Sequence, residues 1–212
     1  MAKTWILDFD GTLVHSEPAI TQCFQRITKK LAPHRLDVAK NVLIGPPLRQ
    51  TVAEILGSPE HPLIDEFVSA FIQMHDDDVL NHTTPYPTAH ETLTNLHQRG
   101  DKMAIATNKR LAPTIKILQH FNWEKFFIFM KCSDSEEVIR DKQQMIEGII
   151  QKDGDFKNAY FVGDTINDGI SSNNCGLLFV KASYGYGKEQ NWSNVNIYKT
   201  IKSIKCLKEI KG

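Results

Sequence analysis

The chain has 212 residues, and its 25 Lys and Arg side chains are balanced by 25 Asp and Glu side chains, so its formal net charge is zero. This length suits one core of ordinary domain size plus a modest insertion. The charge balance excludes the global basic field that holds nucleic acid or an anionic membrane surface, so we expect neither as a partner.

The cysteine pattern and the hydropathy point to one cellular compartment. The four cysteines are widely scattered and none falls in a C-x-x-C pair, so we interpret them as reduced thiols. No apolar stretch is long enough to span a bilayer, and the N-terminus enters a strand at once without a signal-peptide pattern. We therefore expect a cytoplasmic protein.

The first predicted element is a buried strand at Trp5-Ile6-Leu7, which runs into the turn sequence Asp8-Phe9-Asp10-Gly11-Thr12. Residues i and i+2 of a strand share a face, so the carboxylates of Asp8 and Asp10 lie close together and repel. A bound divalent cation removes this repulsion, and oxygen ligands without Cys or His favour Mg²⁺. The plainer alternative is a solvated acidic turn.

The next segment, residues 16–82, is predicted to be helical throughout. Apolar residues recur there at helical spacing, in the three sets Ile20, Phe24, Ile27 and Leu31, then Leu48, Val52 and Ile55, then Leu63, Phe67, Phe71 and Met74. Two prolines with polar neighbours, Pro85 and Pro87, mark a linker at its exit. We predict a small helical cap at 16–82, inserted into a core made of residues 1–15 and 83–212.

Beyond Pro87 helices alternate with short apolar strands. A helix over 89–96 stops at Gly100, and strands are predicted over 103–106, 126–130, 159–162 and 177–180, with helices over 111–118, 145–150 and 168–174 between them. Strands that are apolar on both faces and alternate with helices indicate a parallel sheet covered on both sides. The core is predicted to be a doubly wound, Rossmann-like α/β sheet, and Thr200 to Ile210 is predicted to form a terminal helix.

Polar residues follow several of these strands. In a doubly wound sheet, ligands bind outside the carboxyl ends of the strands. The strand over 103–106 is followed by Thr107-Asn108-Lys109, and the strand over 159–162 is followed by Gly163-Asp164-Thr165-Ile166-Asn167-Asp168. Lys142 precedes the helical pattern of 145–150. We expect these groups to meet Asp8 and Asp10 at one edge of the sheet.

These four pieces, in this order and with a helical insertion after the first, resemble the haloacid dehalogenase-like phosphatases, specifically the phosphoglycolate-phosphatase-like branch with a helical cap. The resemblance runs from Lys3 to about Gly187, and its motifs are Asp8 to Thr12, Thr107-Asn108, Lys142, and Gly163-Asp164 with Asp168. The family lysine is more typically followed by proline, whereas Gln143 follows Lys142 here. Lys131 and Lys152 therefore stay open as alternatives.

The resemblance implies a Mg²⁺ cofactor, held by Asp8, Asp164 and the backbone carbonyl of Asp10. It also implies that Asp8 is a nucleophile that forms an aspartyl phosphate. Asp10 would be the acid for the leaving alkoxide and then the base for the hydrolytic water. Asp168 would orient Lys142 or a metal-bound water.

The same resemblance implies groups that bind the phosphate. Lys142, Thr107 and backbone N–H groups near Asn108 and Phe9 would hold its oxygens. Arg49 follows a rigid Gly-Pro-Pro loop in the cap and is predicted either to bind an anionic substrate tail or to be a solvent-exposed arginine at a helix N-terminus. The run Asp76-Asp77-Asp78 is predicted to be a solvated helix end.

The resemblance implies a Mg²⁺-dependent phosphatase that hydrolyses a small soluble phosphomonoester. Phosphoglycolate, sugar phosphates and nucleoside monophosphates all stay open as substrates, and the chain is expected to be a monomer or a homodimer. A phosphomutase of the same superfamily and a non-catalytic binding module that keeps the fold are the alternatives. A dehalogenase would not need Mg²⁺, and Asp10 and Asp164 argue against it.

Overall fold

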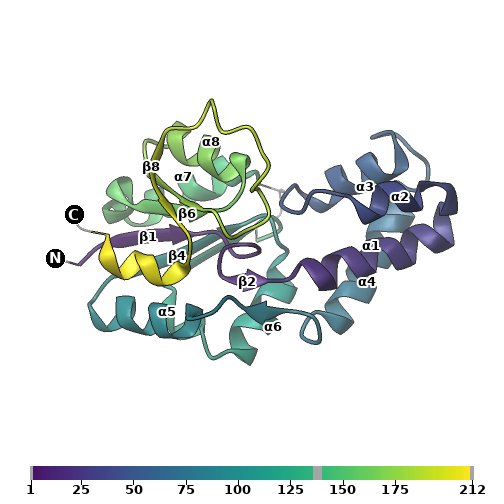
Figure 1. The fold of residues 1–212 in the computed structure, drawn as a ribbon. Coiled ribbons are helices and arrows are strands. Elements are labelled where there is room, and N and C mark those ends of the chain that lie inside the picture. The colour runs from purple at the N-terminus through teal and green to yellow at the C-terminus, as the bar shows by residue number, and fades with distance from the viewer. Residues whose placement is uncertain (1, 136–139, 211–212) are drawn as a thin grey trace.

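A parallel β-sheet forms the centre of the computed structural model, which describes residues 2–135 and 140–210. Within those ranges the sheet has six strands in the order β5-β4-β1-β6-β7-β8, and each pairs in parallel with its neighbours (Figure 1). The strands are β1 Thr4–Leu7, β4 Lys102–Thr107, β5 Phe129–Cys132, β6 Tyr160–Gly163, β7 Leu178–Ala182 and β8 Ile197–Ile201.

Helices cover both faces of this sheet. Figure 1 shows α5 and α6 on one face and α7 and α8 on the other; their bounds are α5 Ala89–Gln98, α6 Leu111–His120, α7 Lys142–Lys152 and α8 Ile166–Asn174. Along β1, Trp5 and Leu7 pack into one hydrophobic cluster and Ile6 packs into the other. All three side chains are fully buried, as expected of a strand with both faces covered. The doubly wound α/β prediction is confirmed.

Two predicted elements differ from the structure. The strand expected over 126–130 begins only at Phe129, because Phe126 belongs to a short 3₁₀ helix, Glu124–Phe126, and is buried with its ring near His90 and His97. The expected terminal helix over 200–210 is the end of edge strand β8 followed by a 3₁₀ helix, Ile204–Glu209.

The prediction at the C-terminus was wrong for a physical reason. The buried residues Ile201, Ile204 and Leu207 recur every three positions, and that spacing suits a helix with three residues per turn as well as an α-helix. Strand β8 alternates partly buried and exposed residues up to the buried Ile201, and Lys199 within it and Lys202 just after it make this segment look like a polar tail in the sequence.

The cap, residues 16–82, lies at the end of the molecule away from both termini (Figure 1). Its α-helices are α1 Glu17–Leu31, α2 Leu36–Lys40, α3 Leu48–Leu56 and α4 Ile64–Asp78. They enclose a hydrophobic cluster of their own that includes Phe24, Ile55 and Phe67. The division at residues 16 and 82 stays a prediction, although a separate cluster of buried residues supports it.

A two-stranded antiparallel ribbon joins the cap to the core. Strand β2, Val14–His15, lies just before the cap and pairs with β3, Thr84–Pro85, just after it. The chain thus leaves and re-enters the core at one place (Figure 1). The first crossing is only a few residues from Asp8 and Asp10, so the cap joins the core beside them.

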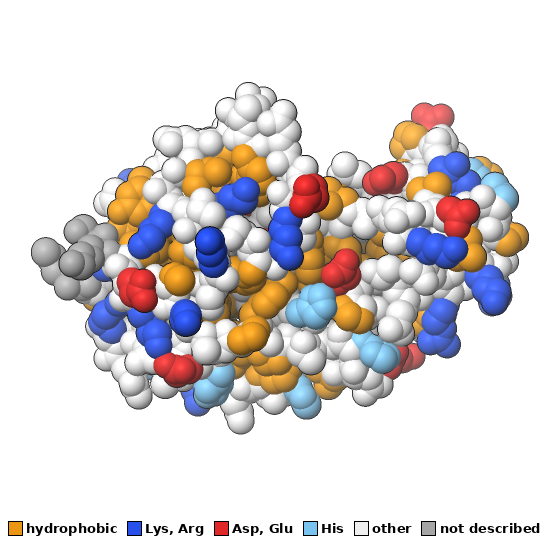
Figure 2. Space-filling model, viewed as in Figure 1, with side chains coloured by type: hydrophobic (Ala, Val, Ile, Leu, Met, Phe, Trp, Pro, Cys, Tyr) orange, Lys and Arg blue, Asp and Glu red, His pale blue; other side chains and the backbone are white. Residues whose placement is uncertain are grey.

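The visible surface is mixed in charge. Figure 2 shows Lys and Arg side chains interspersed with Asp and Glu over both the core and the cap. Among the residues that the structure describes, no helix combines the length and the apolar character needed to cross a membrane.

Candidate active site

The predicted site residues meet at the carboxyl edge of the sheet. Asp8 directly follows β1, Thr107 is the last residue of β4, and Asp164 directly follows β6. Strand β1 lies between β4 and β6, so these three strand ends are neighbours. The backbone N–H of Asp8 continues the ladder by donating to Val162 O at 2.8 Å. Parallel pairing therefore brings together residues that lie far apart in the sequence.

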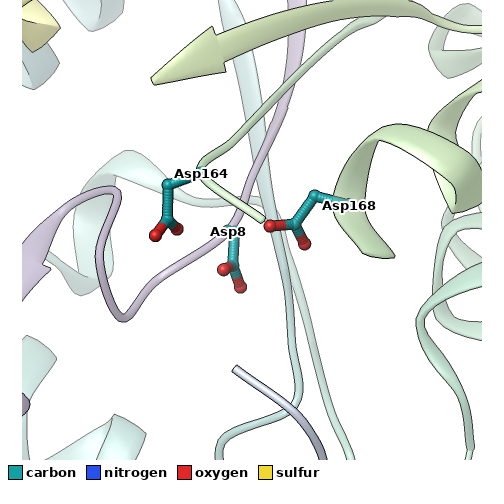
Figure 3. Close-up of side chains that lie close together, drawn as sticks. All are labelled: Asp8, Asp164 and Asp168. Atoms are coloured by element: carbon teal, nitrogen blue, oxygen red, sulfur yellow. The ribbon is translucent and has the colours of Figure 1, made fainter. Parts of the chain in front are cut away.

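Three buried carboxylates form the centre of the site. Oxygen atoms of Asp8, Asp164 and Asp168 all lie within 4.8 Å of one another, and the residues are 6%, 1% and 0% exposed. Figure 3 shows Asp164 and Asp168 on either side of Asp8. Burial, together with the charge of Asp168, raises the pKa of Asp8 to about 7. Burial and both neighbouring carboxylates likewise raise the pKa of Asp164 well above its usual range.

Lys142 supplies a positive charge at this cluster. Its Nζ lies 2.7 Å from Asp8 Oδ1 and 2.9 Å from Asp168 Oδ1, and it donates to Ala106 O at 3.0 Å. Burial alone lowers the pKa of Lys142, but the charges of Asp168 and Asp8 outweigh burial and raise it. The ammonium group is therefore charged at neutral pH.

The start of α7 determines where Lys142 lies. Asp141 caps the helix by accepting from Gln144 N at 2.8 Å, and the Gln144 side chain accepts in return from Asp141 N at 3.1 Å. This capping box makes Lys142 the first helical residue. The two alternative lysines lie elsewhere: Lys131 approaches Gly148 on α7, and Lys152 lies over the ring of Phe129.

Asp168 is held by the start of helix α8. The backbone N–H and the hydroxyl of Thr165 donate to Asp168 Oδ2 at 3.0 and 2.7 Å, so the other carboxylate oxygen faces Lys142. Asp168 thus belongs to the same buried group as Asp8 and Asp164. An orienting role was predicted for Asp168, and in addition its oxygens lie close enough to those of Asp8 and Asp164 to share a cation with them.

Asp164 is held by groups from two segments, the turn after β1 and the loop after β7. Thr12 Oγ1 donates to Asp164 Oδ1 at 3.0 Å, and the backbone N–H of Tyr186 donates to Oδ2 at 2.6 Å. Gly11, at φ +81°, and Gly185 both approach this carboxyl group so closely that a Cβ on either would collide with it. The turn after β1 therefore needs glycine for the carboxylates to come together.

Asp10 faces a different set of partners. Lys109 Nζ lies 3.1 and 3.3 Å from its two carboxylate oxygens, and Ser16 Oγ donates to Oδ1 at 2.5 Å. The Asp10 side chain is not part of the three-carboxylate cluster, which leaves its backbone carbonyl as the expected metal contact. Lys109 was expected at this edge because it follows β4, but no role in the site was predicted for it.

The phosphate-binding candidates lie beside these groups. Thr107 is 1% exposed, and its Oγ1 accepts from Lys109 N at 3.1 Å. Asn108 Nδ2 donates to Gly45 O of the cap at 2.8 Å, while its buried Oδ1 has no hydrogen-bond partner within residues 2–135 and 140–210. The side chain of Phe9 is fully buried in the core, so only its backbone can face a ligand.

Arg49 is not brought to this site. Its Nη1 lies 2.6 Å from Asp65 Oδ1, and both side chains are largely exposed on the cap surface. Arg49 was predicted either to bind an anionic substrate tail or to be solvent-exposed at a helix N-terminus. The structure has it exposed near the start of α3. The solvated run predicted at 76–78 is partly wrong, because Asp76 is only 19% exposed and pairs with Arg110 of the core.

A pocket of about 80 Å³ lies between the acidic cluster and the cap. Its core half includes Asp8, Asp10 and the loop after β4. Its cap half is formed by side chains from α1, α3, α4 and the loop before α3, most of them apolar. Asp8, Asp10 and Thr107 thus open onto a space whose far wall belongs to the cap.

The fold and the site define a hydrolase. The chain belongs to the haloacid dehalogenase-like hydrolase family, whose model matches residues 5–182. It is 29% identical to a phosphoglycolate phosphatase from Rhodobacter capsulatus, over 89% of this chain and 87% of that one. It is 25% identical to the pyrophosphatase PpaX from Halalkalibacterium halodurans, over 99% and 97% of the two chains.

A solved structure shares the whole fold. A haloacid dehalogenase-like family hydrolase from Streptococcus pneumoniae superposes with a TM-score of 0.83 at 20% identity, and the match covers 98% of this chain and 97% of that one. Both the core and the cap therefore have counterparts in a known fold. The resemblance stated from the four motifs is confirmed at the level of the family.

Proposed function

We propose that the protein is a Mg²⁺-dependent phosphatase that hydrolyses a small phosphomonoester through an aspartyl phosphate on Asp8. The observation that carries this proposal is the contact of 2.7 Å between Lys142 Nζ and Asp8 Oδ1 inside a buried group of three carboxylates. Relatives named as phosphatases support it.

The acidic cluster fits a hard divalent cation. Its donors are carboxylate oxygens, and neither Cys nor His accompanies them in the group. Asp8 and Asp164, with the backbone carbonyl of Asp10, would hold Mg²⁺. When bound, Mg²⁺ would offset the carboxylate charge and attract a phosphate oxygen. The raised pKa values of Asp8 and Asp164 reflect burial first and then the repulsion between carboxylates, and a bound cation would offset both effects.

Asp8 is suited to attack phosphorus. Lys142 favours its ionised form and offers a donor to a phosphate oxygen. In the first step an oxygen of Asp8 bonds to phosphorus, the bond from phosphorus to the ester oxygen breaks, and the leaving alkoxide takes a proton from Asp10. In the second step Asp10 takes a proton from water, which attacks phosphorus and releases Asp8 and inorganic phosphate.

The remaining groups position the phosphoryl oxygens and Asp10. Thr107 and backbone N–H groups near Asn108 and Phe9 would hold oxygens of the transferring group. Ser16 and Lys109 fix the carboxylate of Asp10 between the core and the start of the cap. Closure of the cap over the pocket excludes water other than the nucleophile.

The test is phosphate release from small phosphomonoesters with Mg²⁺ and with a chelator. We expect release that needs Mg²⁺, and acid-stable ³²P on the wild-type protein after rapid quenching. Asp8→Asn should abolish both while leaving the circular dichroism spectrum unchanged. Wild-type turnover by Asp8→Asn would show that Asp8 is not the nucleophile. Equal rates with Mg²⁺ and with the chelator would show that the reaction does not need the metal. No phosphate release from any ester would favour the non-catalytic binding module.

A further inference from the structure

We propose that the cap half of the pocket selects an uncharged, small alcohol moiety as the leaving group and discriminates against one that carries a carboxylate. The proposal rests on the proposed phosphatase function, because the same pocket opens onto Asp8 and Asp10. It assigns a substrate class to that site. The cap wall is the set of lining residues that the cap contributes to this pocket.

The cap wall is apolar. Ile20 and Phe24 of α1, Leu48 of α3 and Phe71 of α4 line it, together with Ile44 from the loop before α3. Phe24, Phe71 and Ile44 are at most 8% exposed, so they are held in place by packing. A substrate group placed against this wall loses water without gaining a charged partner. Binding of an apolar group is therefore favoured, and binding of an ionised carboxylate is disfavoured.

The cations of this pocket are already paired. Among the described lining residues, the Lys and Arg side chains are Lys109 and Arg110, and both come from the core loop after β4. Lys109 pairs with Asp10, and Arg110 pairs with Asp76. A second anionic group on the substrate would have to break one of these pairs to find a counter-charge.

The polar side chains of the cap wall are uncharged. Thr51 and His75 line the pocket, and His75 is 5% exposed with its ring stacked on Phe71. Burial lowers the pKa of His75, so the imidazole is neutral at neutral pH. Its Nε2 has no hydrogen-bond partner among the described residues. A neutral nitrogen can bind a hydroxyl group but cannot balance a carboxylate.

The size of the pocket limits the alcohol. The volume of about 80 Å³ holds roughly six water-sized groups, at about 10–15 Å³ for each. The phosphoryl group needs part of this space beside Asp8. The space between the core and the cap wall therefore suits an alcohol moiety of a few non-hydrogen atoms when the cap is in the position seen here.

An isosteric pair of phosphonates tests the charge preference without any turnover. The methylpropyl arm of isobutylphosphonate and the carboxymethyl arm of phosphonoacetate have the same branched shape and differ in charge. With Mg²⁺ present, calorimetry should give a Kd at least tenfold lower for isobutylphosphonate. Equal binding, tighter binding of phosphonoacetate, or no binding of either compound at millimolar concentration would overturn the proposal.

This measurement separates the proposal from the proposed function. Phosphonates are not hydrolysed, so the ratio of their Kd values is obtained whether or not the protein is a phosphatase. Failure of the proposed function would appear instead as no phosphate release from isobutyl phosphate or phosphoglycolate while the binding preference persists. Where both esters react, kcat/KM should favour isobutyl phosphate by a similar factor.

A pair of matched variants locates the discrimination. Leu48→Arg places a cation in the cap wall at a half-buried position and should shift the Kd ratio at least tenfold toward phosphonoacetate. Leu80→Arg makes the same change at a leucine that is 38% exposed and outside the lining, and should leave the ratio within twofold. A folded Leu48→Arg protein with an unchanged ratio would overturn the proposal; should that variant not fold, the wild-type ratio decides.

Discussion

Arg110 Nη1 lies 2.9 and 2.8 Å from the two carboxylate oxygens of Asp76, and this pair joins the core to the last turn of α4 in the cap. Both side chains are less than a quarter exposed, so water screens the pair only in part. A second contact, from Asn108 Nδ2 to Gly45 O, joins the same core loop to another part of the cap. The loop after β4 therefore holds both a predicted phosphate ligand and the cap.

The first prediction concerns cap closure. Asp76→Asn and Arg110→Gln should each raise KM about three- to tenfold, because a weakened junction leaves the pocket open for more of the time. The two changes act on one contact, so the double variant should lose much less than the product of the two factors. Steady-state kinetics on all four proteins gives the coupling, and strictly multiplicative effects would show that the pair does not hold the cap.

The second prediction concerns pH and stability. Burial tends to raise the pKa of Asp76, but its interactions with His75 and Arg110 outweigh burial and lower the pKa below the ordinary 3.8. A carboxyl group with a lowered folded-state pKa contributes stability above its unfolded pKa and loses it as the pH falls. Asp76→Asn should therefore lower the free energy of unfolding at pH 6, and by much less near pH 3.

Urea unfolding of the wild type and the variant at both pH values checks this. The neighbouring Asp77→Asn, at a position that is more exposed than Asp76, is the matched control and should change the free energy by under about 0.5 kcal/mol at either pH. The prediction is contradicted if the free energies of unfolding of wild type and Asp76→Asn differ by the same amount at pH 6 and at pH 3. The contribution of the pair would then not depend on the ionisation of Asp76.

The third prediction concerns Lys109, whose ammonium lies beside both oxygens of Asp10. Lys109→Met should lower kcat about 10–100-fold, because Asp10 would lose a charged partner that fixes its position. Lys205→Met removes an exposed lysine in the C-terminal 3₁₀ helix and is the control for loss of charge alone. A wild-type kcat in Lys109→Met would show that Lys109 is not needed to position the Asp10 carboxylate, and the contact from Ser16 Oγ would then be enough.

The parts of the site that could be predicted follow from regular structure. Asp8, Thr107 and Asp164 were found because a parallel sheet brings the ends of neighbouring strands together whatever the intervening sequence is. Lys142 was placed near a helix start by the apolar pattern, but its role came from the family resemblance, which left Lys131 and Lys152 open. For the three strand-end residues the order of the strands in the sheet determines which residues become neighbours, so the periodicity of apolar residues is enough to predict that they meet.

The parts that could not be predicted depend on how separate units dock. Arg49 lies on a helix whose rotation within the cap decides whether it meets substrate or Asp65, and sequence spacing does not report that rotation. Asp76 has a core partner only because α4 lies against the loop after β4. The pairing of Lys109 with Asp10 depends on the turn within that loop, which no periodic pattern describes.

The last prediction concerns metal and the buried lysine together. Lys142→Met leaves the carboxylates of Asp8 and Asp168 buried without their cation, so without metal it should destabilise the fold by about 3–5 kcal/mol. Added Mg²⁺ would then offset more repulsion in the variant than in the wild type. The rise in Tm between chelator and Mg²⁺ should therefore be larger in Lys142→Met than in wild type or Lys205→Met, as measured by scanning calorimetry. Turnover should fall at least about 10²–10³-fold at every Mg²⁺ concentration, since the lost donor also served the phosphate. A smaller rise in Tm in Lys142→Met would indicate that the cation binds elsewhere than among these carboxylates.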